Sequence, residues 1–296
     1  MSTSIDIVFD RFTRTYLADE KIGCAITIKT KEPIKPKEVT CIIYCIRTID
    51  QNGHDLSGFD GDMRKTPEKI VWQNPITLPK IPATIEDGFN FTFDFVVPKN
   101  SKMCESVRGK FISVDYFVEF TINRGFFSQA LIETRMFFIV NPTTTKPTGD
   151  PVDLTVDQID KKRSMGNKAQ IKAHIHLDTP CACFSKPPSG YIEILEADQP
   201  IEAITVSYLR NEKITVEKGN PILLHSEKSR SYIAENDPPH NVVIPFNMEW
   251  VRIHISPDVE TPAFSITTSL KVRITFFNGA YASATIPLRL YHDLPY

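Results

Sequence analysis

Hydrophobic and polar residues alternate along much of the chain with a period of two. The alternation is clearest over residues 89–97, 111–122 and 264–277. A period of two is typical of antiparallel strands that bury one face and expose the other. The pattern therefore predicts an all-β protein. The positions predicted to face the core are Phe89, Phe91, Phe93, Phe95, Val97, Ile112, Val114, Tyr116, Val118, Phe120, Ile122, Phe264, Ile266, Leu270, Val272, Ile274 and Phe276.

Turn-forming residues separate these strand patterns. Most of the 22 prolines lie between the alternating segments rather than inside them. Short strands punctuated by such turns favour β-sandwiches. Signals for helices are weak, and the best of them is a turn or two over residues 157–164, with Asp157 as the N-cap.

A segment rich in proline and threonine divides the chain near its middle. Residues 141–153 read NPTTTKPTGDPVD, with three prolines and one glycine. Such a segment cannot donate a continuous ladder of hydrogen bonds and is expected to be extended. We therefore expect an N-terminal β-sandwich over residues 1–141, a linker over residues 142–152 and a C-terminal β-sandwich over residues 153–296.

The two halves resemble weak copies of each other. Each contains a strand that ends in a similar sequence, FVVPKN at residues 95–100 and VVIPFN at residues 242–247. In each half a long hairpin follows, turning at residues 123–125 and at Asn278-Gly279. Asn-Gly favours a two-residue hairpin turn in which both residues have a positive φ. We therefore expect a duplicated architecture.

Charge and targeting signals narrow the class of protein. Lys plus Arg is 34 and Asp plus Glu is 36, so the net charge is 34 − 36 = −2, whereas nucleic-acid surfaces need clustered cations. The N-terminal residues lack the apolar segment of a signal peptide, and no apolar run is long enough to span a bilayer. We expect a cytoplasmic protein with no nucleic-acid partner, whose six cysteines are reduced thiols.

Catalytic motifs are absent, so the sequence predicts a protein that is not an enzyme and needs no cofactor. The chain has no G-x-S-x-G, H-E-x-x-H, G-x-G-x-x-G or phosphate-binding P-loop. One segment, HIHLDTPCAC, offers His174, His176, Cys181 and Cys183 as zinc ligands. Their spacings are not those of common zinc fingers. The alternation of Ile171, Ala173, Ile175 and Leu177 favours two histidines on the polar face of a strand instead.

An ordered series of segments resembles one known family. These segments are IDIVFDR at 5–11, the stretch 111–140, PVDLTV at 151–156, residues 190–212, IAENDPPHNVVIPFNM at 233–248 and residues 264–277. Together they are similar to the arrestin-like subunit of the endosomal sorting complexes retromer and retriever. PVDLTV and the segment at 233–248 are more similar to the retriever branch. The resemblance implies an arrestin fold, with two antiparallel β-sandwich domains joined by a short linker.

The resemblance also implies a function without catalysis. Subunits of this family are cytoplasmic, peripheral coat components on endosomes, and they support retrieval and recycling of membrane cargo. They dock onto a long α-solenoid scaffold through a loop of the C-terminal domain. In some complexes the domain junction also meets a sorting nexin and the cytoplasmic tail of a cargo. Membrane association would then be indirect, through these partners.

The docking loop of the family matches five residues of this chain. These are Ile233, Ala234, Glu235, Asn236 and Asp237. We expect Ile233 to be an apolar anchor at the tip of the loop, so that Ile233→Asp abolishes docking with little effect on the melting temperature. Glu235 and Asp237 would form an acidic flank that meets basic residues of the partner. The alternative is an ordinary acidic, proline-rich turn.

The chain departs from the family pattern inside this loop. Asn236 stands where the family has a glycine, and Pro238-Pro239 is a further difference. Asparagine tolerates the left-handed conformation, so the turn is expected to survive the replacement.

A second function remains open, that of an alpha-arrestin-type adaptor that recruits trafficking or ubiquitination machinery. Adaptors of that kind rely on P-P-x-Y motifs. The nearest sequences here are KPPSGY at 186–191, which has one residue too many, and DPPHN at 237–241, which has no tyrosine. The absence of an intact motif favours the sorting-coat function.

Overall fold

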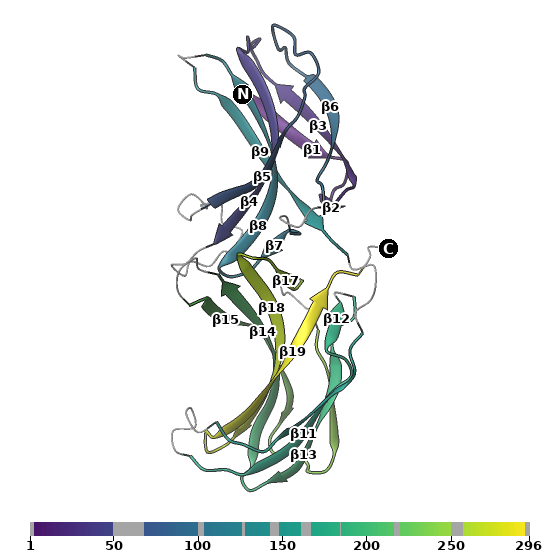
Figure 1. The fold of residues 1–296 in the computed structure, drawn as a ribbon, viewed down its shortest axis with the longest axis vertical. Coiled ribbons are helices and arrows are strands. Elements are labelled where there is room, and N and C mark those ends of the chain that lie inside the picture. The colour runs from purple at the N-terminus through teal and green to yellow at the C-terminus, as the bar shows by residue number, and fades with distance from the viewer. Residues whose placement is uncertain are drawn as a thin grey trace. The chain divides into compact units, whose positions relative to one another are not determined.

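The computed structural model describes residues 3–49, 68–99, 104–125, 128–142, 148–160, 167–183, 185–215, 220–249 and 257–293. These residues form β-strands, turns and extended segments, with no helix in any described range. The contacts divide the chain into two compact units, Met1–Asn141 and Pro142–Tyr296. The prediction of an all-β protein is confirmed (Figure 1).

In the N-terminal unit, two sheets are formed by nine strands in the described residues. One sheet has the order β1-β3-β6, and the other has the order β2-β9-β8-β4-β5, with β7 paired to β8. The strands are β1 (Ser4–Phe9), β2 (Thr15–Leu17), β3 (Lys21–Lys29), β4 (Glu38–Ile49), β5 (Glu68–Pro75), β6 (Phe89–Val96), β7 (Val107–Arg108), β8 (Ile112–Asn123) and β9 (Leu131–Val140).

The C-terminal unit has ten strands in its described residues, again in two sheets. One sheet has the order β10-β11-β13-β16, and the other has the order β12-β19-β18-β14-β15, with β17 paired to β18. The strands are β10 (Val152–Val156), β11 (Ile171–Leu177), β12 (Cys181–Cys183), β13 (Ser189–Ala197), β14 (Ile201–Ile214), β15 (Ile222–Glu235), β16 (Val243–Asn247), β17 (Val259–Glu260), β18 (Phe264–Phe276) and β19 (Tyr281–Tyr291).

The two units share one topology, with β10 as the additional strand of the second. Strands β2 and β12 occupy equivalent places, and each pairs in parallel with the last strand of its unit. The segment FVVPKN begins at the last two residues of β6, and VVIPFN contains the whole of the equivalent edge strand β16. The expected duplication is therefore present in the order of the strands.

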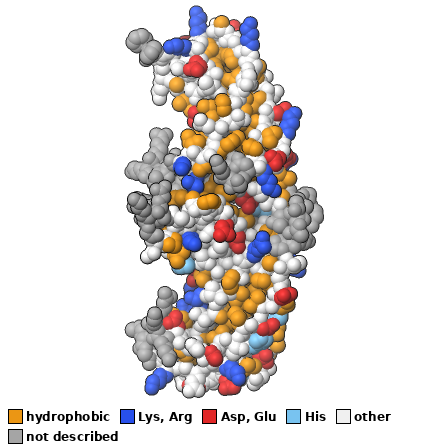
Figure 2. Space-filling view, viewed as in Figure 1, with side chains coloured by type: hydrophobic (Ala, Val, Ile, Leu, Met, Phe, Trp, Pro, Cys, Tyr) orange, Lys and Arg blue, Asp and Glu red, His pale blue; other side chains and the backbone are white. Residues whose placement is uncertain are grey.

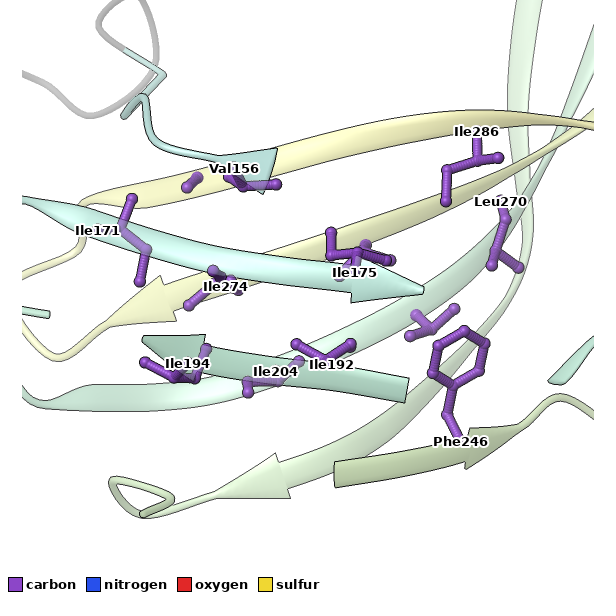
Figure 3. Close-up of a cluster of buried hydrophobic side chains, with 14 of the residues drawn as sticks. Val156, Ile171, Ile175, Ile192, Ile194, Ile204, Phe246, Leu270, Ile274 and Ile286 are labelled. Carbon is purple, nitrogen blue, oxygen red and sulfur yellow. The ribbon is translucent and has the colours of Figure 1, made fainter. Parts of the chain in front are cut away.

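Each unit buries its core between two sheets, as in a sandwich. In the C-terminal unit, side chains of β11 and β13 face those of β14, β18 and β19 (Figure 3). The six positions of β18 predicted to face the core are all buried, as are the six of β8. Burying a large aliphatic side chain contributes about 1.5–3 kcal/mol, so this interface is the main source of stability in the unit.

The hairpin between β18 and β19 differs from the predicted two-residue turn. Its connection spans residues 277–280, and of Asn278 and Gly279 only Gly279 has a positive φ, at 83°. The side-chain oxygen of Asn278 accepts a hydrogen bond from the amide of Ala280 at 2.9 Å. Asparagine thus shapes the turn through its side chain rather than through a left-handed backbone.

The short helix predicted to begin at Asp157 does not form in the described part of the segment. Ile159 instead makes an isolated bridge with Ala282, and the amide of Asp160 donates to the carbonyl of Tyr281. Pairing with the hairpin strand satisfies these backbone groups and outweighs a weak capping signal. Residues 161–164 lie outside the described residues.

The polar face of β8 is not simply solvated. Asp115 is only 2% exposed, and its Oδ1 lies 2.8 Å from Nη2 of Arg108. The hydroxyl of Ser113 donates to Asp115 Oδ2 at 3.0 Å. Glu119, on the same face, is half-buried and accepts a hydrogen bond from the Tyr44 hydroxyl at 3.3 Å. A buried charged network therefore lies within the N-terminal unit.

We predict that Asp115→Ala will lower the free energy of unfolding by about 3 kcal/mol, because it leaves the Arg108 guanidinium without its carboxylate in a nearly buried place. Urea denaturation of the purified chain measures this loss. The control is Asp94→Ala, which removes the exposed ion pair with Lys21 and should have little effect. Equal effects of the two substitutions would contradict the buried network.

Candidate functional site

The segment that resembles the docking loop lies where β15 gives way to β16. The connection between the two strands spans residues 236–242. Three of its residues have left-handed backbones, with φ of 59° at Asn236, 55° at Asp237 and 57° at Asn241. Asn and Asp are the non-glycine residues that adopt this conformation most readily. The expectation that Asn236 can stand in a left-handed turn position is confirmed.

Backbone hydrogen bonds fix this turn to both sheets of the C-terminal unit. The amides of Asn236 and Asp237 donate to the carbonyls of Glu202 and Ile201, at 3.1 and 2.7 Å. The amide of Asn241 donates to the carbonyl of Ile194 in β13 at 2.7 Å. The turn is therefore tied to β14 at its start and to β13 near its end.

Asp237 has a structural role in the turn. One oxygen of its carboxylate accepts a hydrogen bond from the amide of Ile201 at 3.0 Å. The side chain thus completes the pairing of β14 at its first residue. Asp237 is exposed, so its second oxygen faces a surface that a partner can reach.

Ile233 does not lie at a loop tip, and this part of the prediction was wrong. Strand β15 continues to Glu235. Ala234 is opposite Ile204 and Tyr232 is opposite Thr205, which leaves Ile233 as the extra residue of a β-bulge. Ile233 and Ala234 are both half-buried against the hydrophobic core. A bulge changes the side on which side chains point, and simple alternation does not predict it.

The surface around the turn contains apolar residues that the sequence pattern did not indicate. Tyr232 is 62% exposed, and Val242 and Val243 are 46% and 53% exposed. Glu235 and Asn236 are exposed between them along the chain. In the sequence, Tyr232 and Val243 are indistinguishable from core positions of a strand. Tyr232 shares the exposed face of β15 with Arg230, and Val243 shares the exposed face of β16 with Pro245.

The four candidate zinc ligands do not come together. His174 and His176 lie on β11, whereas Cys181 and Cys183 lie on β12 in the other sheet. In the described part of the chain no group of three or more His, Cys, Asp or Glu side chains has the geometry to hold a metal ion.

The two histidines are instead engaged with a carboxylate and an aromatic ring. His174 Nε2 and His176 Nδ1 lie 3.0 and 2.8 Å from Asp153 Oδ1 on the neighbouring strand β10. The ring of Tyr191 stacks on His176 with centroids 4.7 Å apart. The hydrogen bond from His176 holds the pKa of Asp153 below its usual value. These contacts link the additional strand β10 to its neighbour β11 on the outer face of the sheet.

Acidic, basic and hydrophobic side chains are intermixed on the face of the molecule drawn in Figure 2. The described residues contain no helix that is long and apolar enough to cross a membrane.

Comparison with known proteins gives an informative similarity. No family model matches the chain. The chain is similar to vacuolar protein sorting-associated protein 26C of Dictyostelium discoideum, with 19% identity over 312 residues that cover 98% of this chain and 99% of the relative. The similarity therefore includes both units. It supports a relationship to the arrestin-like sorting proteins, and the two all-β sandwiches are those of the arrestin fold.

We predict that Ile233→Asp will lower the free energy of unfolding by about 2 kcal/mol, because a charge replaces an apolar side chain packed against the core. Chemical denaturation followed by intrinsic fluorescence measures the change. The control is Glu235→Ala, an exposed position two residues away, where little change is expected. An unaltered denaturation midpoint for Ile233→Asp would show that Ile233 does not support the core.

Proposed function

We propose that this chain is a non-catalytic subunit of an endosomal cargo-sorting coat. It docks through the turn after β15 onto an α-solenoid scaffold and supports the retrieval and recycling of membrane cargo. The observation that carries the proposal is the similarity to a protein-sorting protein along the whole length of both chains. The arrestin fold and the exposed acidic turn of the C-terminal unit are consistent with it.

The five residues matched to the docking loop take different parts in this proposal. Ile233 and Ala234, at the end of β15, pack against the core and so fix the start of the turn. Glu235 and Asn236 are exposed and present a carboxylate and an amide to the scaffold. The carboxylate of Asp237 accepts a hydrogen bond from the amide of Ile201 in β14, and the residue is exposed to a partner. A turn that is fixed before binding loses little conformational entropy when the partner docks.

The partners follow from the same proposal. The scaffold is of the retriever or retromer type, and the segments at residues 151–156 and 233–248 favour the retriever branch. A sorting nexin and cargo cytoplasmic tails are further partners. The chain itself is cytoplasmic and peripheral on endosomes, and its membrane association is indirect.

Affinity purification of the tagged chain from native lysate tests the proposal. We expect recovery of a large helical-repeat protein, identified by mass spectrometry. Glu235→Lys should reduce that recovery about tenfold or more, because it places a cation where the partner is expected to present cations. The melting temperature should not change, since Glu235 is exposed.

The matched control is Glu260→Lys, which makes the same charge reversal at an exposed position on β17 of the same unit. This variant should retain the partner. Recovery of no helical-repeat protein with the unmodified chain would overturn the proposed function.

A further inference from the structure

Three connections lie side by side at one end of the C-terminal sandwich. They are the turn after β15, the turn that joins β13 to β14, and the hairpin that joins β18 to β19. Figure 1 shows the end of the C-terminal unit where β18 meets β19. We call residues 198–202, 235–241 and 277–280 the turn rim. In the sheet order β18-β14-β15, strand β14 lies between the other two. The start of β14 therefore lies between the hairpin tip and the candidate docking turn.

Hydrogen bonds join these three connections into one surface. The amide of Phe277 donates to the carbonyl of Pro200 at 3.2 Å. On the other side of β14, the amide of Asp237 donates to the carbonyl of Ile201 at 2.7 Å. Two strand spacings, about 10 Å, separate the backbones of the hairpin tip and the docking turn. One helix of a partner is wide enough to contact both.

Phe277 is the large apolar side chain of this rim. It is 60% exposed, although its neighbour Phe276 is fully buried in the core. The backbone of the hairpin is already fixed by hydrogen bonds between Phe276 and residues 279 and 280, and by the contacts of Asn278. Phe277 is thus held at a rigid tip, where its ring can enter a hollow between helices without the entropy cost of ordering a loop.

Acidic side chains are frequent in the turn rim. Four exposed carboxylates belong to the rim, those of Asp198, Glu202, Glu235 and Asp237. One exposed cation, Lys168, lies next to the hairpin. Its backbone carbonyl accepts a hydrogen bond from the side chain of Asn278. The rim as a whole therefore complements a surface that is basic with an apolar hollow.

We propose that Phe277 is a second anchor for the scaffold, and that the whole rim receives a basic face of α-helices with an apolar hollow for the phenylalanine ring. This inference rests on the proposed docking function. It places the apolar contact on the β18–β19 hairpin. The segment matched to the docking loop ends at Asp237, more than 35 residues before this hairpin. Ile233, the anchor expected from the sequence, is half-buried in the bulge and packs against the core, so Phe277 presents the larger exposed apolar surface.

Isothermal titration calorimetry of the full chain with the purified helical-repeat scaffold tests the inference. Phe277→Ser should raise Kd about tenfold or more, the effect expected on removing an interface aromatic. Phe277→Leu should retain much of the affinity, since it keeps an apolar side chain. Raising the ionic strength from about 0.05 to 0.5 M should weaken binding of the unmodified chain, because charge attraction is screened.

The matched control is Leu223→Ser on β15. Leu223 is also 60% exposed, but it lies at the opposite end of the same strand from the docking turn. It should leave Kd unchanged, and circular dichroism should show that each variant remains folded. If Glu235→Lys weakens binding and Phe277→Ser does not, the second anchor is wrong and the docking function stands. If neither substitution affects binding, docking at this end of the unit is wrong altogether.

Discussion

The C-terminal unit depends on the pairing of β14 along both of its sides. This strand is flanked by β15 and β18 over nearly its whole length. Buried backbone amides and carbonyls must be paired, and successive residues of a central strand direct theirs to alternate neighbouring strands. At the first residue, Ile201, one side is completed by the amide and carboxylate of Asp237. The turn that we propose for docking is therefore part of the pairing of the central strand.

Alternation of residue type was enough to predict the long strands β6, β8 and β18 but not the irregularities of the sheets. The inward positions of β8 and β18 follow from sequence because each apolar side chain gains free energy on its own by burial. A β-bulge gives no comparable local signal. The bulge at Ile233 depends on how β15 aligns with β14, which is set by residues far away in the chain. For this reason the role of Ile233 could not be predicted.

Buried polar residues show a second limit of the sequence pattern. Asp115 alternates with the core positions of β8, so a period of two places it on the polar face. The neighbouring β7 shows why it can be buried, because that strand supplies Arg108. A two-residue strand such as β7 has too few positions to show a period. Phe277 is the converse case. It follows a buried phenylalanine in a strand pattern, and it becomes exposed because the chain turns there.

The two units use the same strand order with different chemistry at equivalent positions. Val107 opposite Val114 corresponds to Val259 opposite Ile266 in the second unit. Two residues further along β8, Tyr116 is opposite Cys45 of β4. At the equivalent place in β18, Thr268 is opposite Arg210 of β14. All four side chains are buried. The shared topology therefore does not require a shared filling of the core.

The differences at the turn between this chain and the family pattern that it resembles are consistent with each other physically. Glycine adopts the left-handed conformation freely, but it also leaves the unfolded chain many conformations to lose. Asn236 and Asp237 accept that conformation at some cost, which the hydrogen bonds to Ile201 and Glu202 offset. The two prolines that follow restrict the chain further, and Pro238 is buried. Asparagine at the position where the resembled pattern has glycine and the two prolines after it thus act in one direction, towards a turn that has its final shape before any partner binds.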